Sequence, residues 1–135
     1  MAGKSFTAQL EDFERLTVQN LKYIASEAIQ DVVEGMQTPA RGISKGGSLQ
    51  VGKIPVAEAE LINSLSTDGG TPSADSYSVA ISGFEIGDVM TFSYTAPHAF
   101  VKEVGKGGMA GWHFMGVNAR KFPAFVEARA KEVRR

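Results

Sequence analysis

The first third of the chain carries apolar side chains at intervals of three and four residues. An α-helix turns once every 3.6 residues, so this spacing places the side chains on one helical face. Between Phe6 and Met36 there is no proline, and Gly35 is the only glycine. The face comprises Leu10, Phe13, Leu21, Ile24, Ala28, Val32 and Met36. We therefore predict one long amphipathic helix over this region.

Both ends of this helix have local signals. Ser5 and Thr7 can each serve as the N-cap, so the start is expected between residues 5 and 9. Gly35, followed by Thr38 and Pro39, predicts the end. An extended start is an alternative, because residues 5–10 also alternate in polarity.

The centre of the chain changes to a period of two. In residues 76–82, Tyr77, Val79 and Ile81 alternate with serine and alanine, and in residues 89–95 the larger side chains alternate with smaller ones. β-Branched and aromatic residues dominate both runs, and a segment with two glycines joins them. This pattern predicts a β-hairpin.

The last third returns to helical spacing. Residues 98–105 allow about one helical turn that Gly105 stops, and residues 106–111, KGGMAG, predict a flexible tip. From residue 112 to the end, the spacing predicts a helix with one aromatic face. Pro123 interrupts it, so we expect a kink or a helix that restarts with proline in its first turn.

Glycine-rich stretches separate these elements. Residues 37–53 hold four glycines and one proline and predict a long mobile loop, and Ser66–Asp75 predicts a second loop. The segment between them, GKIPVAEAELINSL at 52–65, fits a short helix or a strand. The order predicts a single α+β domain over residues 1–135, with a long N-terminal helix, a small antiparallel sheet with a hairpin, and a C-terminal helix.

Composition narrows the function classes. The chain has 14 basic and 15 acidic residues, scattered without a patch, which argues against a protein that grips nucleic acid through phosphates. Cysteine is absent, which excludes disulfides, thiolate metal sites and Cys nucleophiles. There is no run of ~18 apolar residues and no apolar signal region at the start. The simplest expectation is a soluble protein made in the cytoplasm.

Candidate catalytic chemistry is sparse. His98 and His113 are the only histidines and have no carboxylate pair at metal-ligand spacing. The glycines of residues 105–111 lack the Walker spacing, and no serine lies in a G-x-S-x-G elbow. Glu58 and Glu60 could act as an acid–base pair, but on an exposed element such carboxylates are usually solvated. We predict no enzyme, no catalytic residue, no cofactor and no metal.

Two other function classes stay open. One is a small hydrolase that uses the two histidines with carboxylates. The other is a nucleic-acid-binding module that uses Lys45, Lys53, Lys102 and Lys106. Against both, the bulky residues near the C-terminus fit a core with part reserved for a partner surface, and flexible loops and open sheet edges are typical of self-assembling subunits. These bulky residues are Trp112, Phe114, Met115, Phe122 and Phe125.

Four segments, taken in order, resemble one phage family. Residues 52–65 resemble the signature G-R-x-P-V-D-T-G-x-L-R-x-S-L of the neck and tail-completion proteins of long-tailed phages, also described as minor tail components. The matching positions are Gly52, Lys53, Pro55, Val56, Leu61, Ser64 and Leu65. Residues 75–105 resemble the family's hairpin and its Y-A-x-x-x-E-Y-G motif, with Glu103 and Gly105. Residues 111–134 resemble its closing F-V-x-x-N-A-x-x-F helix, with Asn118, and the likeness begins at the helix that ends in MQTP.

The chain also departs from this family pattern. Ala57, Glu58 and Ala59 replace Asp-Thr-Gly, which predicts an extension of helix or strand in place of a capped turn. Val104 replaces a tyrosine, and His98 stands at a usual tyrosine position. These changes concern local turn geometry more than the fold.

The resemblance implies a structural virion protein of a tailed phage, a prophage or a phage-derived particle, made in the host bacterial cytoplasm. Such proteins form a ring, here expected to be a hexameric homo-oligomer, that terminates the tail tube and joins tail to neck without catalysis. The implied partners are the tail tube protein and a neck or stopper protein, with DNA only passing through the lumen and no membrane. An adaptor or stopper ring nearer the portal is an alternative. The candidate assembly loops contain Ile43, Ser44, Lys45, Lys53, Lys106 and Met109.

Overall fold

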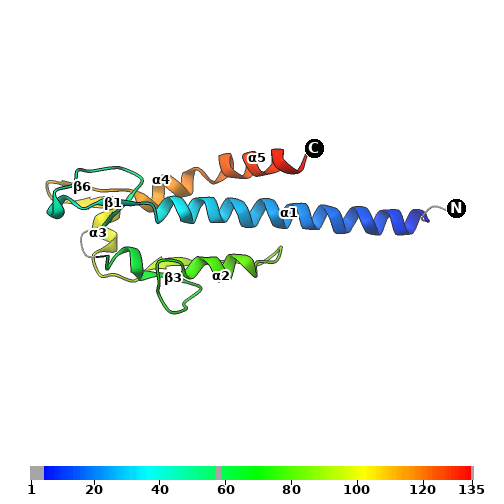
Figure 1. Cartoon of the computed structure of the whole chain (residues 1–135), viewed down its shortest axis with the longest axis horizontal. Helices are drawn as coiled ribbons and strands as arrows, with labels where there is room; N and C mark the ends of the chain where they lie inside the picture. Colours follow the sequence, from blue (N-terminus) through cyan, green and yellow to red (C-terminus); the bar gives the residue numbers. More distant parts are fainter. Residues whose placement is uncertain (1–4, 57–58, 135) are drawn as a thin grey trace.

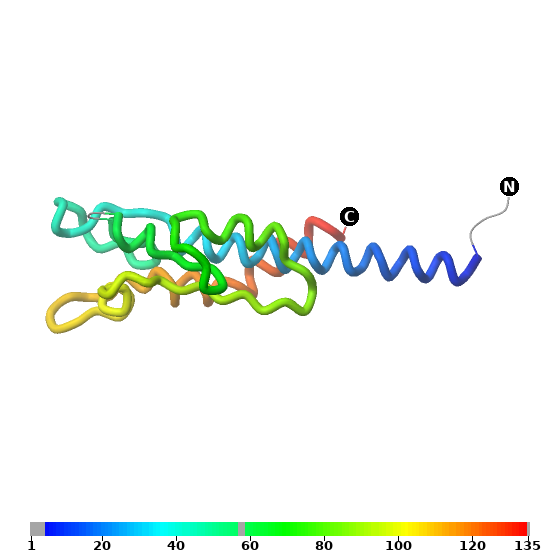
Figure 2. The backbone as a smooth tube through the Cα atoms, turned by 90° about the horizontal axis from the view of Figure 1, so that it is seen from below, coloured from blue at the N-terminus to red at the C-terminus, as the bar shows by residue number. Residues whose placement is uncertain are grey.

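The computed structural model describes residues 5–56 and 59–134 and has the predicted α+β class (Figure 1). A long helix runs along the molecule, and the other elements lie beside its C-terminal half and beyond its C-terminal end. The view turned by 90° shows the N-terminal part of that helix projecting alone (Figure 2). The elements are α1 (Phe6–Met36), β1 (Pro39–Arg41), the 3-10 turn Ile43–Lys45, β2 (Ile54–Val56), the 3-10 turn Ile62–Ser64, β3 (Leu65–Thr67), α2 (Ser76–Ser82), β4 (Phe92–Tyr94), α3 (Ala99–Val104), β5 (Gly105–Lys106), β6 (Met109–Ala110), α4 (Phe114–Arg120) and α5 (Phe122–Val133).

Helix α1 forms as predicted and begins at the predicted cap. The Ser5 hydroxyl oxygen accepts a 3.1 Å hydrogen bond from the Ala8 N–H. With 31 residues at 1.5 Å per residue, the helix is ~46 Å long. Its buried residues are Ala28, Val33 and Met36, all near its C-terminal end. The apolar face is therefore continuous along the sequence, but other elements cover only part of it.

The strands form three separate two-stranded sheets. β1 and β2 are parallel, with Ala40 opposite Pro55. β3 and β4 are antiparallel, with Leu65 opposite Tyr94, and β5 pairs with β6 in an antiparallel hairpin. The predicted loop over residues 37–53 thus contains a strand and a 3-10 turn. The segment 52–65 forms both alternatives, since it contains β2 and a 3-10 turn.

The predicted hairpin over residues 76–95 is wrong. Residues 76–82 form helix α2, and β4 pairs with β3, whose Ser66 and Thr67 were expected in a loop. A strand would place Val79 and Ile81 on the same face, yet Ile81 is buried and Val79 is 82% exposed. Instead, Tyr77, Ile81 and Phe84 follow helical spacing, and the latter two are buried. In β4 the predicted alternation holds, because Phe92 and Tyr94 are half-buried and Ser93 is exposed.

In the C-terminal third, the helix boundaries lie at the predicted glycine and proline. Helix α3 ends at Gly105, and residues 106–111, expected to form a flexible tip, form the β5–β6 hairpin. The final helix is divided, with Pro123 in the first turn of α5. Helix α5 packs along α1 and is held there by Arg129. The Arg129 guanidinium donates to both carboxylate oxygens of Asp31 at 2.8 and 2.9 Å.

The main core lies where the sheets meet the C-terminal end of α1. Ile54 and Phe114 are fully enclosed, and the Tyr94 and Phe114 rings meet edge to face with centroids 5.0 Å apart. The cluster comprises Ala40, Ile54, Leu61, Ala96, Trp112 and Phe114. Of the predicted aromatic face, Trp112 and Phe114 are core, whereas Phe122 is exposed.

Candidate functional site

The candidate site is the end of the molecule where the two glycine-rich segments meet, which we call the loop end: residues 41–53 and 105–111. Four of the residues that carry the resemblance hold the two segments together: Gly52 and Gly105 lie within the loop end, and Glu103 and Asn118 lie next to it. Gly52 donates its N–H to the Trp112 carbonyl at 2.7 Å, and its own carbonyl accepts from the Asn118 side-chain amide at 2.9 Å. Gly52 has φ +91°, which glycine adopts without strain. Two motif residues 66 positions apart therefore meet directly.

Asn118 is the buried anchor of this junction. Its amide also donates to the Phe114 carbonyl at 2.6 Å, within helix α4. On its other side lies Gly35 of α1, where an added Cβ would stand 2.2 Å from the Asn118 side-chain oxygen. Because Gly35 lacks a side chain, α4 can approach α1 closely at this point. The predicted helix-ending glycine thus has a packing role inside the helix.

Glu103 caps helix α4. Its two carboxylate oxygens accept hydrogen bonds from the Met115 and Gly116 N–H groups, at 2.9 and 2.8 Å. Both groups lie in the first turn of α4, where N–H groups have no partner within the helix and a negative charge is favoured. Glu103 therefore fixes where α4 begins relative to α3.

Gly105 allows the β5–β6 hairpin to follow α3 without a gap. Its φ is +86°, and a Cβ there would stand 2.5 Å from the Met109 carbonyl oxygen. The neighbouring backbone is tied in place, since Trp112 N–H donates to the Lys102 carbonyl at 2.8 Å and His113 N–H donates to the Glu103 carbonyl at 3.0 Å. Gly105 and Glu103 thus position the hairpin tip together.

The signature segment forms the floor of the loop end. Pro55, Leu61, Ser64 and Leu65 are buried, and Val56 is half-buried. The Ser64 hydroxyl donates to the Leu61 carbonyl at 2.7 Å, so it stabilises the 3-10 turn. Ala59 has a left-handed φ of 62°. Ala57 and Glu58 lie outside the described residues, so the predicted extension and the pairing of Glu58 with Glu60 lie outside them too.

An open cleft of about 620 Å³ lies between the two loops. Its lining includes Ile43, Ser44 and Met109 from the candidate assembly loops, and Pro55 and Leu61 from the signature segment. Further lining residues are Leu49, Glu60, His98, Lys102 and Trp112. The structure thus brings the two predicted loops together around a shared, largely apolar surface.

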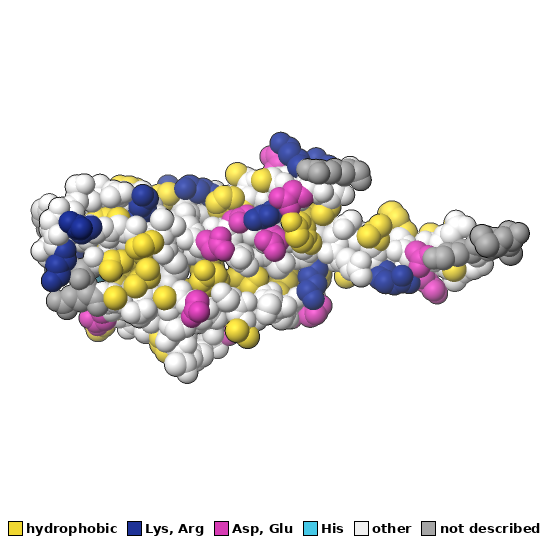
Figure 3. Space-filling model, in the orientation of Figure 1, with side chains coloured by type: hydrophobic (Ala, Val, Ile, Leu, Met, Phe, Trp, Pro, Cys, Tyr) yellow, Lys and Arg dark blue, Asp and Glu magenta, His cyan; other side chains and the backbone are white. Residues whose placement is uncertain are grey.

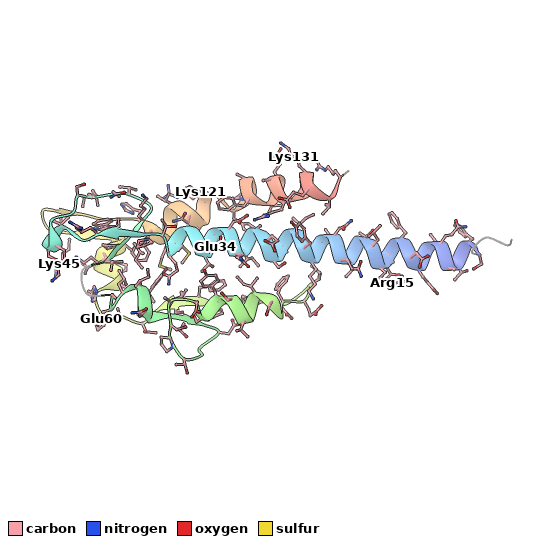
Figure 4. All side chains as sticks on the ribbon, viewed as in Figure 1. Arg15, Glu34, Lys45, Glu60, Lys121 and Lys131 are labelled. Atoms are coloured by element: carbon pink, nitrogen blue, oxygen red, sulfur yellow. The ribbon has the colours of Figure 1, made fainter. Side chains whose placement is uncertain are left out.

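The tips of the loop end are apolar and basic. Ile43 is 56% exposed and Met109 55% exposed, and Lys45, Lys53 and Lys106 are also exposed. Within residues 5–56 and 59–134, none of these lysines forms an ion pair. Figure 4 places Lys45 and Glu60 at this end, far from Arg15 on the projecting part of α1.

The residues proposed for hydrolysis are not gathered into one site. His98 lines the cleft, whereas His113 lies at the start of α4 with a left-handed φ of 50°. No three His, Asp or Glu side chains within the described ranges form a group that could hold a metal ion.

A buried polar network behind the cleft was not predicted. Tyr94 O–H donates to the Gln37 side-chain oxygen at 2.6 Å, and the Gln37 amide nitrogen donates to the Ile62 and Ala74 carbonyls. Burial, reinforced by the nearby Glu103 charge, raises the pKa of Tyr94 well above its usual value. The network ties the end of α1 to three later segments. No local sequence signal indicated these contacts, since Gln37 and Tyr94 are 57 residues apart.

None of the described helices combines the length and apolarity that crossing a membrane requires. Comparison with protein-family profiles, with curated proteins and with solved structures gives no match, so the resemblance in the motifs stays a prediction.

Proposed function

We propose that this chain is a structural subunit that acts by assembly and not by catalysis, as a ring at the head–tail junction of a tailed phage or a phage-derived particle. In this role it terminates the tail tube and joins it to the neck. Its partners are copies of itself, six to a ring, the tail tube protein, and a neck or stopper protein.

The observation that carries the proposal is the amount of exposed surface. The chain exposes 8532 Å². A compact monomer of 14.4 kDa exposes about 6,800 Å². Among the described residues, seventeen large apolar side chains are exposed, against twelve buried hydrophobic residues besides Pro55 and the glycines. A chain with this balance gains stability by covering its surface with other subunits.

The placement of the motif residues supports the same role. Gly52, Glu103, Gly105 and Asn118 act through backbone geometry and hydrogen bonds, and their contacts hold two loops side by side at one end. A ring subunit needs such residues, because its contact surfaces must keep one fixed geometry. A formal net charge of −1 suits a lumen through which DNA passes without adhering.

The test combines native mass with location. Purified protein is expected to sediment as an oligomer, and antibody labelling of particles is expected at the junction between head and tail. A monomer at every concentration, together with absence from mature particles, overturns the proposal. A tail-tube gene immediately downstream favours the terminator position over an adaptor or stopper ring nearer the portal.

A second candidate has one specific observation in its favour. Of the four lysines of the nucleic-acid hypothesis, Lys45, Lys53 and Lys106 lie in the loop end, and Lys102 lines the cleft beside them. Binding through these lysines would weaken steeply with salt. Filter binding with single- and double-stranded DNA at low salt tests it, and no measurable affinity there excludes it.

A further inference from the structure

The N-terminal half of α1 carries an apolar stripe that no other segment of residues 5–56 and 59–134 covers. We call residues 6–21 the arm. Phe6, Leu10 and Phe13 follow the spacing i, i+4, i+7, so they lie on one face of the helix. Phe6 is 73% exposed and Phe13 70% exposed. This spacing is the one by which amphipathic helices dock into apolar grooves.

An apolar groove of about 290 Å³ lies elsewhere on the same chain, between α1, β4 and the α4–α5 junction. Its lining is almost entirely apolar and comprises Ile29, Val32, Val33, Met36, Phe92, Ala119 and Phe122. An apolar cavity of roughly 150 Å³ accommodates a benzene ring, so this groove has room for one or two aromatic side chains. The groove therefore fits the size and chemistry of the arm's anchors.

The arm cannot reach the groove of its own chain. Both belong to the same uninterrupted helix, and Phe13 precedes Ile29 by 16 residues. At 1.5 Å per residue this separation is about 24 Å along the axis. Figures 1 and 2 both show the arm pointing away from the rest of the molecule. An arm that fills this groove must come from another molecule.

The charges beside the two surfaces are opposite on balance, because the arm carries three acidic residues and one basic residue, Arg15. Glu11 and Glu14 are exposed on the arm, and Arg120 and Lys121 are exposed beside Ala119 and Phe122 of the groove. In Figure 3, Lys and Arg side chains lie along α4, and side chains of both signs lie on α5 and on the arm. Opposite charges around an apolar contact favour the correct partner and orientation.

We propose that the arm of one copy docks in the groove of a second copy, with Phe6, Leu10 and Phe13 facing the groove. The inference rests on the proposed function as a self-assembling subunit and names its contact. Four large apolar side chains lie on this stripe of the arm, Phe6, Leu10, Phe13 and Leu21, and each is at least 49% exposed. Together they supply on the order of half of the ~800 Å² per partner of a standard interface. A contact between two different surfaces of one chain can propagate and close into a ring.

Site-specific crosslinking tests the occupant directly, because the chain has no cysteine. Thr17 lies on the same stripe of the arm, and Ala119 is an exposed groove residue. Thr17→Cys protein is mixed under oxidation with size-tagged Ala119→Cys protein. The mixed disulfide is expected to form at least tenfold faster than with Val79→Cys in place of Thr17→Cys, since Val79 is exposed outside both surfaces. Equal rates overturn the proposal.

Self-association measured by sedimentation provides the second test. Phe6→Ser/Phe13→Ser is expected to raise the dissociation constant about 100-fold, because two aromatic anchors lose their burial. The control Val79→Ser/Val89→Ser alters two exposed valines outside the arm and groove and is expected to leave it unchanged. An oligomeric wild type that the arm variant does not weaken overturns this inference and leaves the proposed function standing. A wild type that is monomeric at every concentration overturns this inference, and its absence from mature particles in addition overturns the proposed function.

Discussion

Asn118 can be buried because the helix that faces it lacks a side chain at Gly35. The close approach of the Asn118 side chain to the Gly35 backbone leaves no room for a methyl group, since a Cβ would lie 2.2 Å from the amide oxygen. Glycine inside a helix normally costs about 1 kcal/mol relative to alanine. Here the glycine makes room for the Asn118 side chain, whose amide also donates to the Gly52 carbonyl.

This pair predicts a reversal of the usual glycine-to-alanine effect. Gly35→Ala should lower the free energy of unfolding by about 2 kcal/mol in the native chain, because the buried amide must move. In an Asn118→Ala background the same change should be neutral or stabilising by up to about 1 kcal/mol. Urea denaturation of the four proteins measures the coupling. Gly83→Ala, where a Cβ would meet only ordinary contacts, is the control. Equal costs of Gly35→Ala in both backgrounds would contradict this account.

Tyr94 makes the free energy of unfolding depend on pH in the alkaline range. Burial raises the pKa of Tyr94, so the folded state holds the phenol proton more tightly than the unfolded chain does. Its contribution to stability is complete below the unfolded pKa of about 10 and falls as the pH rises above that value. Tyr94→Phe should reduce the loss of unfolding free energy between pH 9 and pH 11 by about 1 kcal/mol.

Urea denaturation at pH 8, 9 and 11 measures this difference. Tyr23 and Tyr77, whose pKa values are also raised, are present in both proteins and cancel in the comparison. At pH 8 the variant is expected to be less stable, because the hydrogen bond to Gln37 is lost. Identical slopes with pH for the two proteins would exclude Tyr94 as the source.

At the scale of elements, α4 depends on a cap supplied by another helix. Glu103→Ala should lower the free energy of unfolding by about 1 to 2 kcal/mol, since two first-turn N–H groups lose their charged partner. Glu127→Ala, which removes an exposed carboxylate on α5, should change it by less than about 0.5 kcal/mol. Thermal unfolding followed by circular dichroism compares them. Equal effects of the two substitutions would show that the cap contributes nothing.

The elements that the sequence predicted correctly are those with local signals. Ser5 marks the start of α1, Gly105 ends α3, and Pro123 divides the last helix. The prediction for residues 76–82 was wrong because seven residues are too few to distinguish the strand period from the helical period. Tyr77 and Ile81 are four residues apart, which places them on the same face of a strand and also on the same face of a helix. In the folded chain this segment packs as helix α2 against α1 and β3.

The supports of the candidate site were less predictable for a different reason. The resemblance selected Gly52 and Asn118 as motif positions, but nothing local indicated that they meet across 66 residues. The same holds for Gln37 and Tyr94, which are 57 residues apart. Such contacts arise only when α1, α4 and the short sheets are placed together. Sequence patterns could therefore indicate candidate residues but not the geometry that joins them.

At the scale of the whole molecule, folding and assembly should be separable. Deleting residues 43–50 removes the exposed tip of one loop but none of the main core cluster. The deletion protein is expected to stay soluble with an unchanged helical spectrum but, under the proposed function, to fail in particle assembly. By contrast, Leu61→Ala should lower the free energy of unfolding by about 2 to 4 kcal/mol, because most of a buried side chain is removed. A deletion protein that still supports particle assembly would contradict this division.

The arm of α1 has a consequence for how assembly begins. The arm has sixteen helical residues whose large apolar side chains are all exposed, and this length lies near the limit at which an isolated helix is stable in water. We expect the arm to fray in dilute monomer and to become fully helical only when another copy covers it. Helical ellipticity per residue should then rise with protein concentration, and the Phe6→Ser/Phe13→Ser variant should show no rise. Ordering and association would form one equilibrium, so the entropy cost of ordering the arm would hold back assembly until the subunits are abundant.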